Sequence, residues 1–334
     1  MKNLHSFWLL FLLGFSGFSL ITCCNHNVPT GDAVLYVGLM IHLEGHKTDT
    51  REAHDIYADG IKSYTDIFDE YGARVTWEVK EPIESCDKFN DYYFKDIENR
   101  GHGIGVHADI GGNRDDTAYT YTHFVNDLKF MKKQLEKQDV TVRHASGICS
   151  HLDWVSGVIE AGYSFVTGIV GYCTVSLPEE LIPEEYKDCL GPGDCHDLYP
   201  DELQERMHPW RANTKNWTEY DPNGELVILP AAINGLLYLA ELQDNPDYNG
   251  DFQFTLEDID AYIDLLEEAI TYVDPDKVNT FYLSWSYGKA LDEALIHEWL
   301  LRIESYIEEG KVEWKTLPEM YDIYVEWEKN QCLP

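Results

Sequence analysis

The chain has 334 residues, of which 44% are hydrophobic and 13% aromatic, so it is long enough to bury one large core. Its formal net charge is −35, from 60 acidic and 25 basic side chains, and no basic patch interrupts this balance. Such a surface repels nucleic acid and anionic membranes, which excludes both as expected partners, and it suits solubility or a neutral or cationic substrate.

The N-terminus has the features of an export leader. An apolar run from Phe7 to Ile21 follows Lys2 and is shorter than a spanning helix usually needs. It ends in Leu20-Ile21-Thr22-Cys23-Cys24, which resembles a bacterial lipoprotein signal. We therefore expect residues 1–23 to be a leader, with Cys23 lipidated after cleavage, so that the exported protein meets the membrane only through a lipid anchor. Ordinary secretion after cleavage nearby is the alternative.

Six cysteines follow the leader region, at positions 86, 149, 173, 189, 195 and 332. An even number in an exported domain is compatible with three disulfides. Cys189 and Cys195 flank Gly191-Pro192-Gly193, and we expect them to form a local loop staple. The spacings fit no C-x-x-C pattern, which argues against a structural zinc site.

Between residues 30 and 330 the hydrophobic pattern alternates between strands and helices. The expected strands are Ala33–Glu44, Arg74–Lys80, 103–110, Val140–Ser146, Tyr163–Val170, Glu225–Ala231, Val278–Ser286 and Val312–Thr316. The expected helices are Arg51–Tyr71, Lys88–Asn99, Thr117–Gln138, His151–Ala161, Leu256–Val273, Ala290–Glu309 and Pro318–Lys329. Residues 172–224 break the rhythm with six prolines, which predicts a loop-rich insertion lying over the C-terminal rim. Seven or eight β/α units predict one α/β domain, a closed or nearly closed barrel.

The stretch 101–112 carries the clearest chemical pattern. Read with a period of two, its aliphatic residues share one face, and Gly103, Gly105, His107 and Asp109 share the other. If the aliphatic face packs on helices, His107 and Asp109 point into the lumen at the C-terminal end of their strand, where chemistry collects in β/α barrels. The two glycines then leave room beneath these side chains.

The same test on the other strands brings further polar groups to this rim. His42 and Glu44 point inward from the first strand, with His46 just beyond, and Glu78 points inward from the second. Two imidazoles and several carboxylates at one rim indicate a divalent-metal site, because a catalytic zinc takes three nitrogen or oxygen ligands and keeps one position open. The alternative is a set of ion pairs that only closes the barrel mouth.

At these residues the chain resembles the polysaccharide deacetylase superfamily, the family 4 carbohydrate esterases. Gly101-His102-Gly103-Ile104-Gly105-Val106-His107 is similar to the family's second motif, whose histidine binds metal, and Ile41-His42-Leu43-Glu44-Gly45 is similar in placement to the first, Thr-Phe-Asp-Asp-Gly. Arg143 with Gly162-Tyr163, and Trp314 to Met320, resemble the third motif and the closing Thr-Leu-Pro-Glu turn. The resemblance spans residues 33–325 and implies a deformed (β/α)7-8 barrel and metal-assisted deacetylation of an N- or O-acetylated polysaccharide or oligosaccharide.

The chain departs from the family at the reactive positions. Leu43 stands where the family has its catalytic-base aspartate, and Glu44 where it has the metal-binding aspartate. Gly111 stands at the place of the second metal-binding histidine, and the region Leu283–Ser286 replaces the late catalytic histidine. The fold is therefore expected to carry over more completely than the mechanism.

A mechanism adapted to these departures assigns a role to each candidate. His42, Glu44 and His107 hold the metal, with zinc the expected ion, and Asp109 or Glu78 accepts a proton from the attacking water. Arg143 or His144 stabilises the oxyanion, although Arg143 is equally expected to pair with a carboxylate, and alternation does not decide which of the two points inward. A sugar platform is expected from Trp210, Arg211 and Trp285, unless the two tryptophans belong to the core.

Three other interpretations of the function remain possible. A non-catalytic glycan-binding surface lipoprotein on a degenerate deacetylase scaffold explains the missing motif residues directly. A metal-independent glycoside hydrolase uses two of Glu44, Glu78 and Asp109. An amidohydrolase-type barrel uses His42 and His46, but the fifth and sixth strands offer it no histidine.

Overall fold

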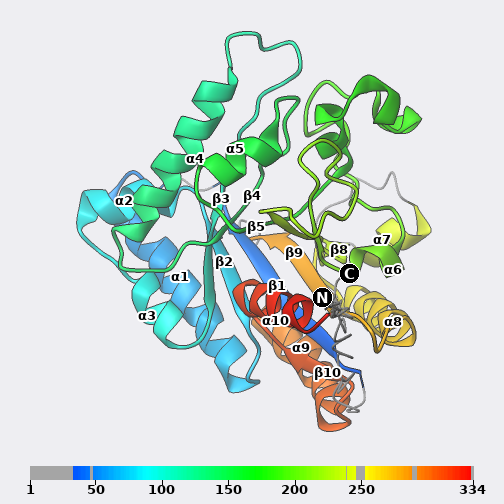
Figure 1. Ribbon diagram of the computed structural model, residues 1–334. Helices are drawn as coiled ribbons and strands as arrows, with labels where there is room; N and C mark the ends of the chain where they lie inside the picture. The colour runs from blue at the N-terminus through cyan, green and yellow to red at the C-terminus, as the bar shows by residue number, and fades with distance from the viewer. Residues whose placement is uncertain (1–32, 46–47, 238, 246–252, 288–291, 332–334) are drawn as a thin grey trace, which may run out of the picture. The chain divides into compact units, whose positions relative to one another are not determined.

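Ten strands form one curled, mainly parallel sheet in the computed structural model (Figure 1). They are β1 (Leu35–Leu43), β2 (Val75–Val79), β3 (Gly103–His107), β4 (His144–Ser146), β5 (Phe165–Thr167), β6 (Trp210–Arg211), β7 (Val227–Leu229), β8 (Ile233–Asn234), β9 (Asn279–Ser286) and β10 (Val312–Trp314). Their order is β6-β7-β5-β4-β3-β2-β1-β9-β8, and β10 pairs with the start of β1. All pairs are parallel except β6 with β7. Because no ladder among the described residues joins β7 to β8, the barrel is deformed and open there, which confirms the expected fold class.

The structure describes residues 33–45, 48–237, 239–245, 253–287 and 292–331. The predicted leader with Cys23, His46 and Cys332 lie outside these residues. Asp32 to Gln331 form one compact unit by their internal contacts. Within the described segments, no helix is both long enough and apolar enough to cross a membrane.

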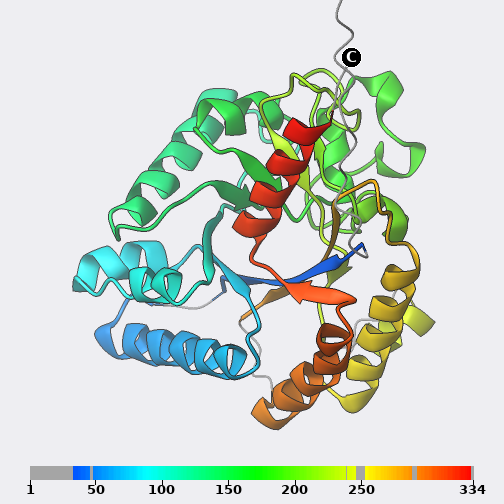
Figure 2. The same cartoon turned by 60° about the horizontal axis from the view of Figure 1, so that its bottom comes forward.

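The helices follow the strands, as the alternating pattern predicts. They are α1 (Arg51–Glu70), α2 (Pro82–Phe89), α3 (Phe94–Asn99), α4 (Tyr121–Glu136), α5 (Trp154–Glu160), α6 (Leu203–Arg206), α7 (Leu239–Asp244), α8 (Leu256–Thr271), α9 (Glu293–Glu308) and α10 (Leu317–Asn330). Several begin where a side chain caps the first turn: Thr120 before α4, Thr255 before α8 and Thr316 before α10 each accept a bond from the backbone N–H three residues later. Figure 2 shows how most helices surround the curled sheet.

The core has an outer and an inner layer. The outer layer packs helices on the sheet through large side chains such as Phe68, Trp77 and Trp299, which are fully buried. The inner layer fills the lumen with Met40, Phe165 and Tyr282, and α10 contributes to it along one face. Side chains therefore occupy this part of the lumen, and the C-terminal end of the sheet is the expected place for chemistry.

Three sequence expectations differ from the structure. The helix expected over Lys88–Asn99 is two helices, because Pro82 starts α2 early and Asn90 ends it in the left-handed conformation at φ 51°. Strand β8 and helix α7 were not expected, since two and six residues give too short a periodic signal. The insertion contains the 3₁₀ helices η1 (Gly171–Ser176), η2 (Glu179–Leu181) and η3 (Glu184–Tyr186), as well as α6 and β6.

Two disulfides lie in and beside the insertion. Cys189 is bonded to Cys195, as the spacing predicts, and Cys149 is bonded to Cys173. Backbone N–H groups of Gly171 and Tyr172 donate to the carbonyls of Asp197 and Cys195, which joins the segment that carries Cys173 to the segment that carries Cys195. Of the other two cysteines, Cys86 is a buried free thiol and Cys332 lies outside the described residues.

Candidate metal centre at the barrel rim

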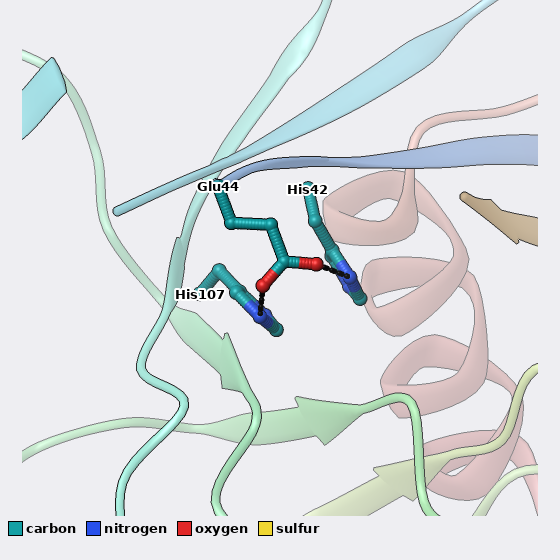
Figure 3. A group of neighbouring side chains, drawn as sticks. All are labelled: His42, Glu44 and His107. Atoms are coloured by element: carbon teal, nitrogen blue, oxygen red, sulfur yellow. Dashed lines mark hydrogen bonds and ion pairs between the residues drawn. The ribbon is translucent and has the colours of Figure 1, made fainter. Parts of the chain in front are cut away.

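Three side chains from two strands meet at the C-terminal edge of the sheet. His42 and Glu44 come from β1 and the residue after it, and His107 ends β3 (Figure 3). His107 Nε2 lies 3.0 Å from Glu44 Oε2, and His42 Nδ1 lies 3.8 Å from Glu44 Oε1. The two imidazole rings stack with their centroids 3.9 Å apart. The period-two faces predicted for these strands therefore bring the three side chains together.

The remaining ring nitrogen of each histidine faces a buried partner. His42 Nε2 lies 3.2 Å from Glu78 Oε2, and His107 Nδ1 lies 2.8 Å from the hydroxyl of Ser146. Glu78 is fully buried and also accepts hydrogen bonds from Ser146 and Thr167, while His144 Nε2 lies 3.2 Å from it. A carboxylate or hydroxyl behind a histidine fixes the ring orientation and is the usual support of a metal-binding imidazole.

The surroundings set the charge of these groups. Burial raises the pKa of Glu78, but bonds from His144 and His42 outweigh it and hold the pKa well below its usual range. The hydrogen bond from His107 has the largest effect on Glu44, and it lowers the pKa of that carboxyl against the opposing effect of burial. Burial, followed by the nearby His42, lowers the pKa of His107. These surroundings favour the ionised carboxylates of Glu44 and Glu78 and the neutral imidazole of His107. Ionised carboxylates and neutral imidazoles are the forms that bind metal.

The donor set fits a divalent cation. Tetrahedral zinc with ligands at about 2.0–2.1 Å places neighbouring ligand atoms about 3.3 Å apart. The three ligand atoms here lie within 4.8 Å of one another. The separations of His107 from Oε2 and of His42 from Oε1 of Glu44 lie on either side of the zinc value. His42, Glu44 and His107 would therefore hold the ion as two imidazoles and one carboxylate with a small adjustment of side chains.

A cleft of about 310 Å³ opens over this cluster. It is lined by residues at the C-terminal ends of β1, β3, β4, β5, β8 and β9, which places it where β/α barrels do their chemistry. Pro192, His196 and Leu198 of the insertion also line it. This part of the insertion therefore lies at the C-terminal rim, where the whole insertion is predicted to lie.

Asp109 lines the same cleft from the loop after β3. The strand ends at His107, and Asp109 adopts a left-handed backbone with φ 44°, which is uncommon for a residue other than glycine. Its carboxylate forms an ion pair with Lys80, and its side chain is 53% exposed. Asp109 is therefore the carboxylate of the set that solvent and substrate reach most easily.

Four of the predicted site residues lie elsewhere. Both terminal nitrogens of Arg143 donate to the carboxylate of Asp322, and one of them also donates to the carbonyl of Pro318. Arg143 therefore connects the start of β4 to α10 and does not face the cleft. His144 takes the inward position but is fully buried behind Glu78. Arg211 pairs with Glu328, and Trp210 donates to the carbonyl of Trp217, so neither lines the cleft.

Trp285 does line the cleft, but only 6% of it is exposed. Its ring lies 6.3 Å from that of Phe68 and 6.0 Å from that of Trp299, within the outer core. The expected sugar platform of Trp210, Arg211 and Trp285 is therefore not assembled. His102, which belongs to the same motif as His107, is buried and bonded to Asp69.

Sequence reasoning missed several residues of the site. Ser146 and Thr167 hold Glu78, and Ser286 donates to Glu44 Oε1 at 2.6 Å. His196 and Asn234 line the cleft from the insertion and from β8. The three hydroxyl residues, Ser146, Thr167 and Ser286, lie on different strands. A single hydroxyl on a strand has no distinctive spacing, so the alternation test along each expected strand could not identify them.

The space predicted beside Gly105 is occupied by the side chain of His144, so a larger residue at position 105 should lower stability. A Cβ at Gly105 would lie 2.1 Å from His144 Nε2, so the glycine makes space for His144 and not for His107. We expect Gly105→Ala to lower the free energy of unfolding by about 2–3 kcal/mol through overpacking. Gly193→Ala is the control, since nothing lies within 4 Å of its Cβ position. Urea denaturation with equal midpoints for both variants would contradict this packing.

Solved structures with the same architecture include two described as polysaccharide deacetylases. The one from Mycobacterium smegmatis superposes with a TM-score of 0.55 at 13% identity, covering 89% of this chain and 92% of its own. The one from Pseudomonas aeruginosa PAO1 gives 0.52 at 12% identity, covering 91% and 94%. Puue Allantoinase gives 0.53 at 11% identity, covering 88% and 91%. The chain therefore shares the architecture of these structures, and its motifs imply the same architecture.

No protein-family model matches the chain, and no curated protein sequence does. Identities of 11–13% establish the architecture alone. Since one fold supports several chemistries, the reaction must be argued from the residues of the site.

Proposed function

We propose that this protein is a divalent-metal-dependent hydrolase that removes acyl groups, acetyl in the simplest case, from an N- or O-acetylated polysaccharide or oligosaccharide outside the cytoplasm. The observation that carries the proposal is the cluster of His42, Glu44 and His107 at the floor of a rim cleft, with Glu78 and Ser146 behind its histidines. The deacetylase fold of the two similar structures supports the substrate class.

The position of His42 explains how the site works without a family histidine. Gly111 stands where the resemblance expects the second metal-binding histidine, and its φ of 126° lies in the region that favours glycine. His42 lies on β1, which β2 separates from β3, and its ring is stacked on that of His107. An imidazole from β1 therefore supplies the ligand that the loop after β3 lacks.

The proposed chemistry divides between the ion and the side chains. When bound, a divalent cation such as zinc polarises the scissile carbonyl and a water molecule. Asp109 accepts the proton of the attacking water, since it is exposed in the cleft and anchored by Lys80. It returns that proton to the sugar oxygen or nitrogen as the bond from that atom to the acyl carbon breaks, which leaves the free carboxylic acid. Glu78 is enclosed by Ser146, Thr167 and the histidines, so its role is to orient His42.

The proposed setting is the cell envelope or the extracellular space. Two disulfides and a lipoprotein-like leader support export, because disulfides persist in oxidising compartments. Attachment through a lipid on Cys23 belongs to the same proposal. Mass spectrometry of the mature N-terminus tests it, and a free N-terminus elsewhere in the leader region would contradict the anchor.

Release of acetate from N-acetylated and O-acetylated oligosaccharides tests the proposed activity. We expect the purified protein to release acetate. This activity should be lost after dialysis against a chelator and should return when zinc is added. Turnover unaffected by the chelator would contradict the metal-dependent mechanism. Tight zinc binding with no turnover on either substrate class would instead favour the non-catalytic glycan-binding protein.

A further inference from the structure

The cleft over the metal cluster has an unusual lining for a site that binds sugar. Apolar atoms make up most of its surface, and six aliphatic side chains from separate parts of the chain contribute to it: Ile110, Val170, Pro192, Leu198, Leu236 and Leu237. The only aromatic side chain among the lining residues is Trp285, which is 6% exposed and packed against core rings. A stacking surface for a sugar ring is therefore small.

A buried sugar also needs partners for its hydroxyl groups, because an unpaired polar group costs free energy when water is removed. Apart from the metal cluster and Asp109, the polar side chains of the cleft are those of His196, Asn234, Ser284 and Ser286. Ser286 already donates to Glu44. The aliphatic wall thus suits hydrocarbon better than a polyhydroxylated ring.

The size of the cleft exceeds what an acetyl group needs. A volume of 310 Å³ corresponds to roughly ten times the share of one water molecule in the liquid, about 30 Å³. An acetyl group places a single methyl beyond its carbonyl carbon. With the carbonyl at the cluster, most of the cleft would be left for a longer chain.

We propose that the cleft holds the hydrocarbon chain of an acyl group longer than acetyl, with the sugar outside at the rim. This inference rests on the proposed function, since it places the acyl carbonyl at His42, Glu44 and His107. It names the part of the substrate that the cleft selects: a linear aliphatic acyl chain attached to a carbohydrate.

Straight-chain hydroxamates test the inference without requiring turnover, because the hydroxamate group binds zinc and the chain mimics the acyl group. Isothermal titration calorimetry would compare acetohydroxamate, butyrohydroxamate and hexanohydroxamate on the zinc-loaded protein. We expect Kd to fall about fourfold for each added methylene until the chain fills the cleft, which is the effect of burying one methylene.

A matched pair of variants locates the effect. Leu198 lines the cleft and is half-buried, whereas Leu190 lies in the same insertion, is 51% exposed and does not line the cleft. Leu198→Phe should remove the advantage of hexanohydroxamate and leave acetohydroxamate binding unchanged. Leu190→Phe should behave as the unmodified protein. Zinc content and the urea midpoint of each variant establish that it is folded.

The outcomes separate the inference from the function on which it rests. Equal affinities for all three hydroxamates, or equal behaviour of the two variants, would overturn the acyl-chain assignment and leave the metal-dependent function standing. Failure of every hydroxamate to bind zinc-loaded protein would overturn both. Chain-length dependence that only Leu198→Phe removes supports the assignment.

Discussion

Replacement of His107 by alanine should abolish tight zinc binding. His107 supplies one of three ligand atoms, and loss of even an outer support of a metal site costs about 10–100-fold in affinity. We therefore expect more than a 100-fold loss of zinc affinity, and loss of acyl hydrolysis with it. Equilibrium dialysis against zinc measures the affinity directly.

Stability measurements distinguish a ligand from a structural histidine. Without metal, His107→Ala should lower the free energy of unfolding by about 1–3 kcal/mol, because the buried ring bonds Ser146 and Glu44. Zinc at about 100 times its Kd should stabilise the unmodified protein by about 2.7 kcal/mol and this variant hardly at all. Urea denaturation with and without zinc gives both numbers.

His102 provides the matched control. It precedes the same strand, is equally enclosed, and bonds Asp69 and the backbone of Val75. His102→Ala should cost a similar amount of stability yet keep its zinc. Glu44→Gln combined with His107→Ala should cost little more zinc affinity than either change alone, since both act on one ion. Additive destabilisation with unchanged zinc content would falsify the site.

Asp109→Asn should remove catalysis and leave the metal in place. General acid–base catalysis contributes about 10²–10⁴-fold, so kcat should fall by that factor. The amide keeps the size of the side chain, and Asp109 is not among the three proposed ligands, so zinc content should stay at the level of the unmodified protein. Acetate release and zinc analysis on the same preparation check both statements.

Two further variants test whether Lys80 positions Asp109 for the proposed proton transfer. Lys80→Gln removes the ammonium that pairs with Asp109 and should lower kcat by a smaller factor, since Lys80 is a positioning residue. Asp115→Asn lies six residues further in the same loop region, on an exposed side chain, and should leave kcat unchanged. A normal kcat in Asp109→Asn would assign the proton transfer to another group.

The repeating part of the fold was predictable because period-two and helical patterns are strong in long elements. The alternation in β1 and β3 placed His42, Glu44 and His107 on inward faces, and the structure joins them. Glu78 also points inward as predicted. Its expected role as a proton acceptor is replaced by a supporting role, because hydroxyls from β4 and β5 enclose its carboxylate. Such contacts between side chains of different strands cannot be seen in the sequence of any one strand.

Alternation gives no account of residues beyond the strand ends. Asp109 lines the cleft as expected, but it lies after the last residue of β3, in a left-handed turn, so period-two reasoning does not explain its direction. Arg143 precedes a strand of only three residues and turns to Asp322 on α10, more than 170 residues away. Trp210 and Arg211 lie in an antiparallel edge strand whose position the loop-rich insertion does not encode locally.

The central claim is that His42, Glu44 and His107 hold one divalent cation. A crystal grown with zinc, measured at energies on both sides of the zinc absorption edge, tests it most directly. We predict one strong anomalous peak at about 2.0–2.1 Å from His42 Nδ1, His107 Nε2 and a Glu44 oxygen. A crystal at saturating zinc that shows no peak there, with His107 still hydrogen-bonded to Glu44, would contradict the account.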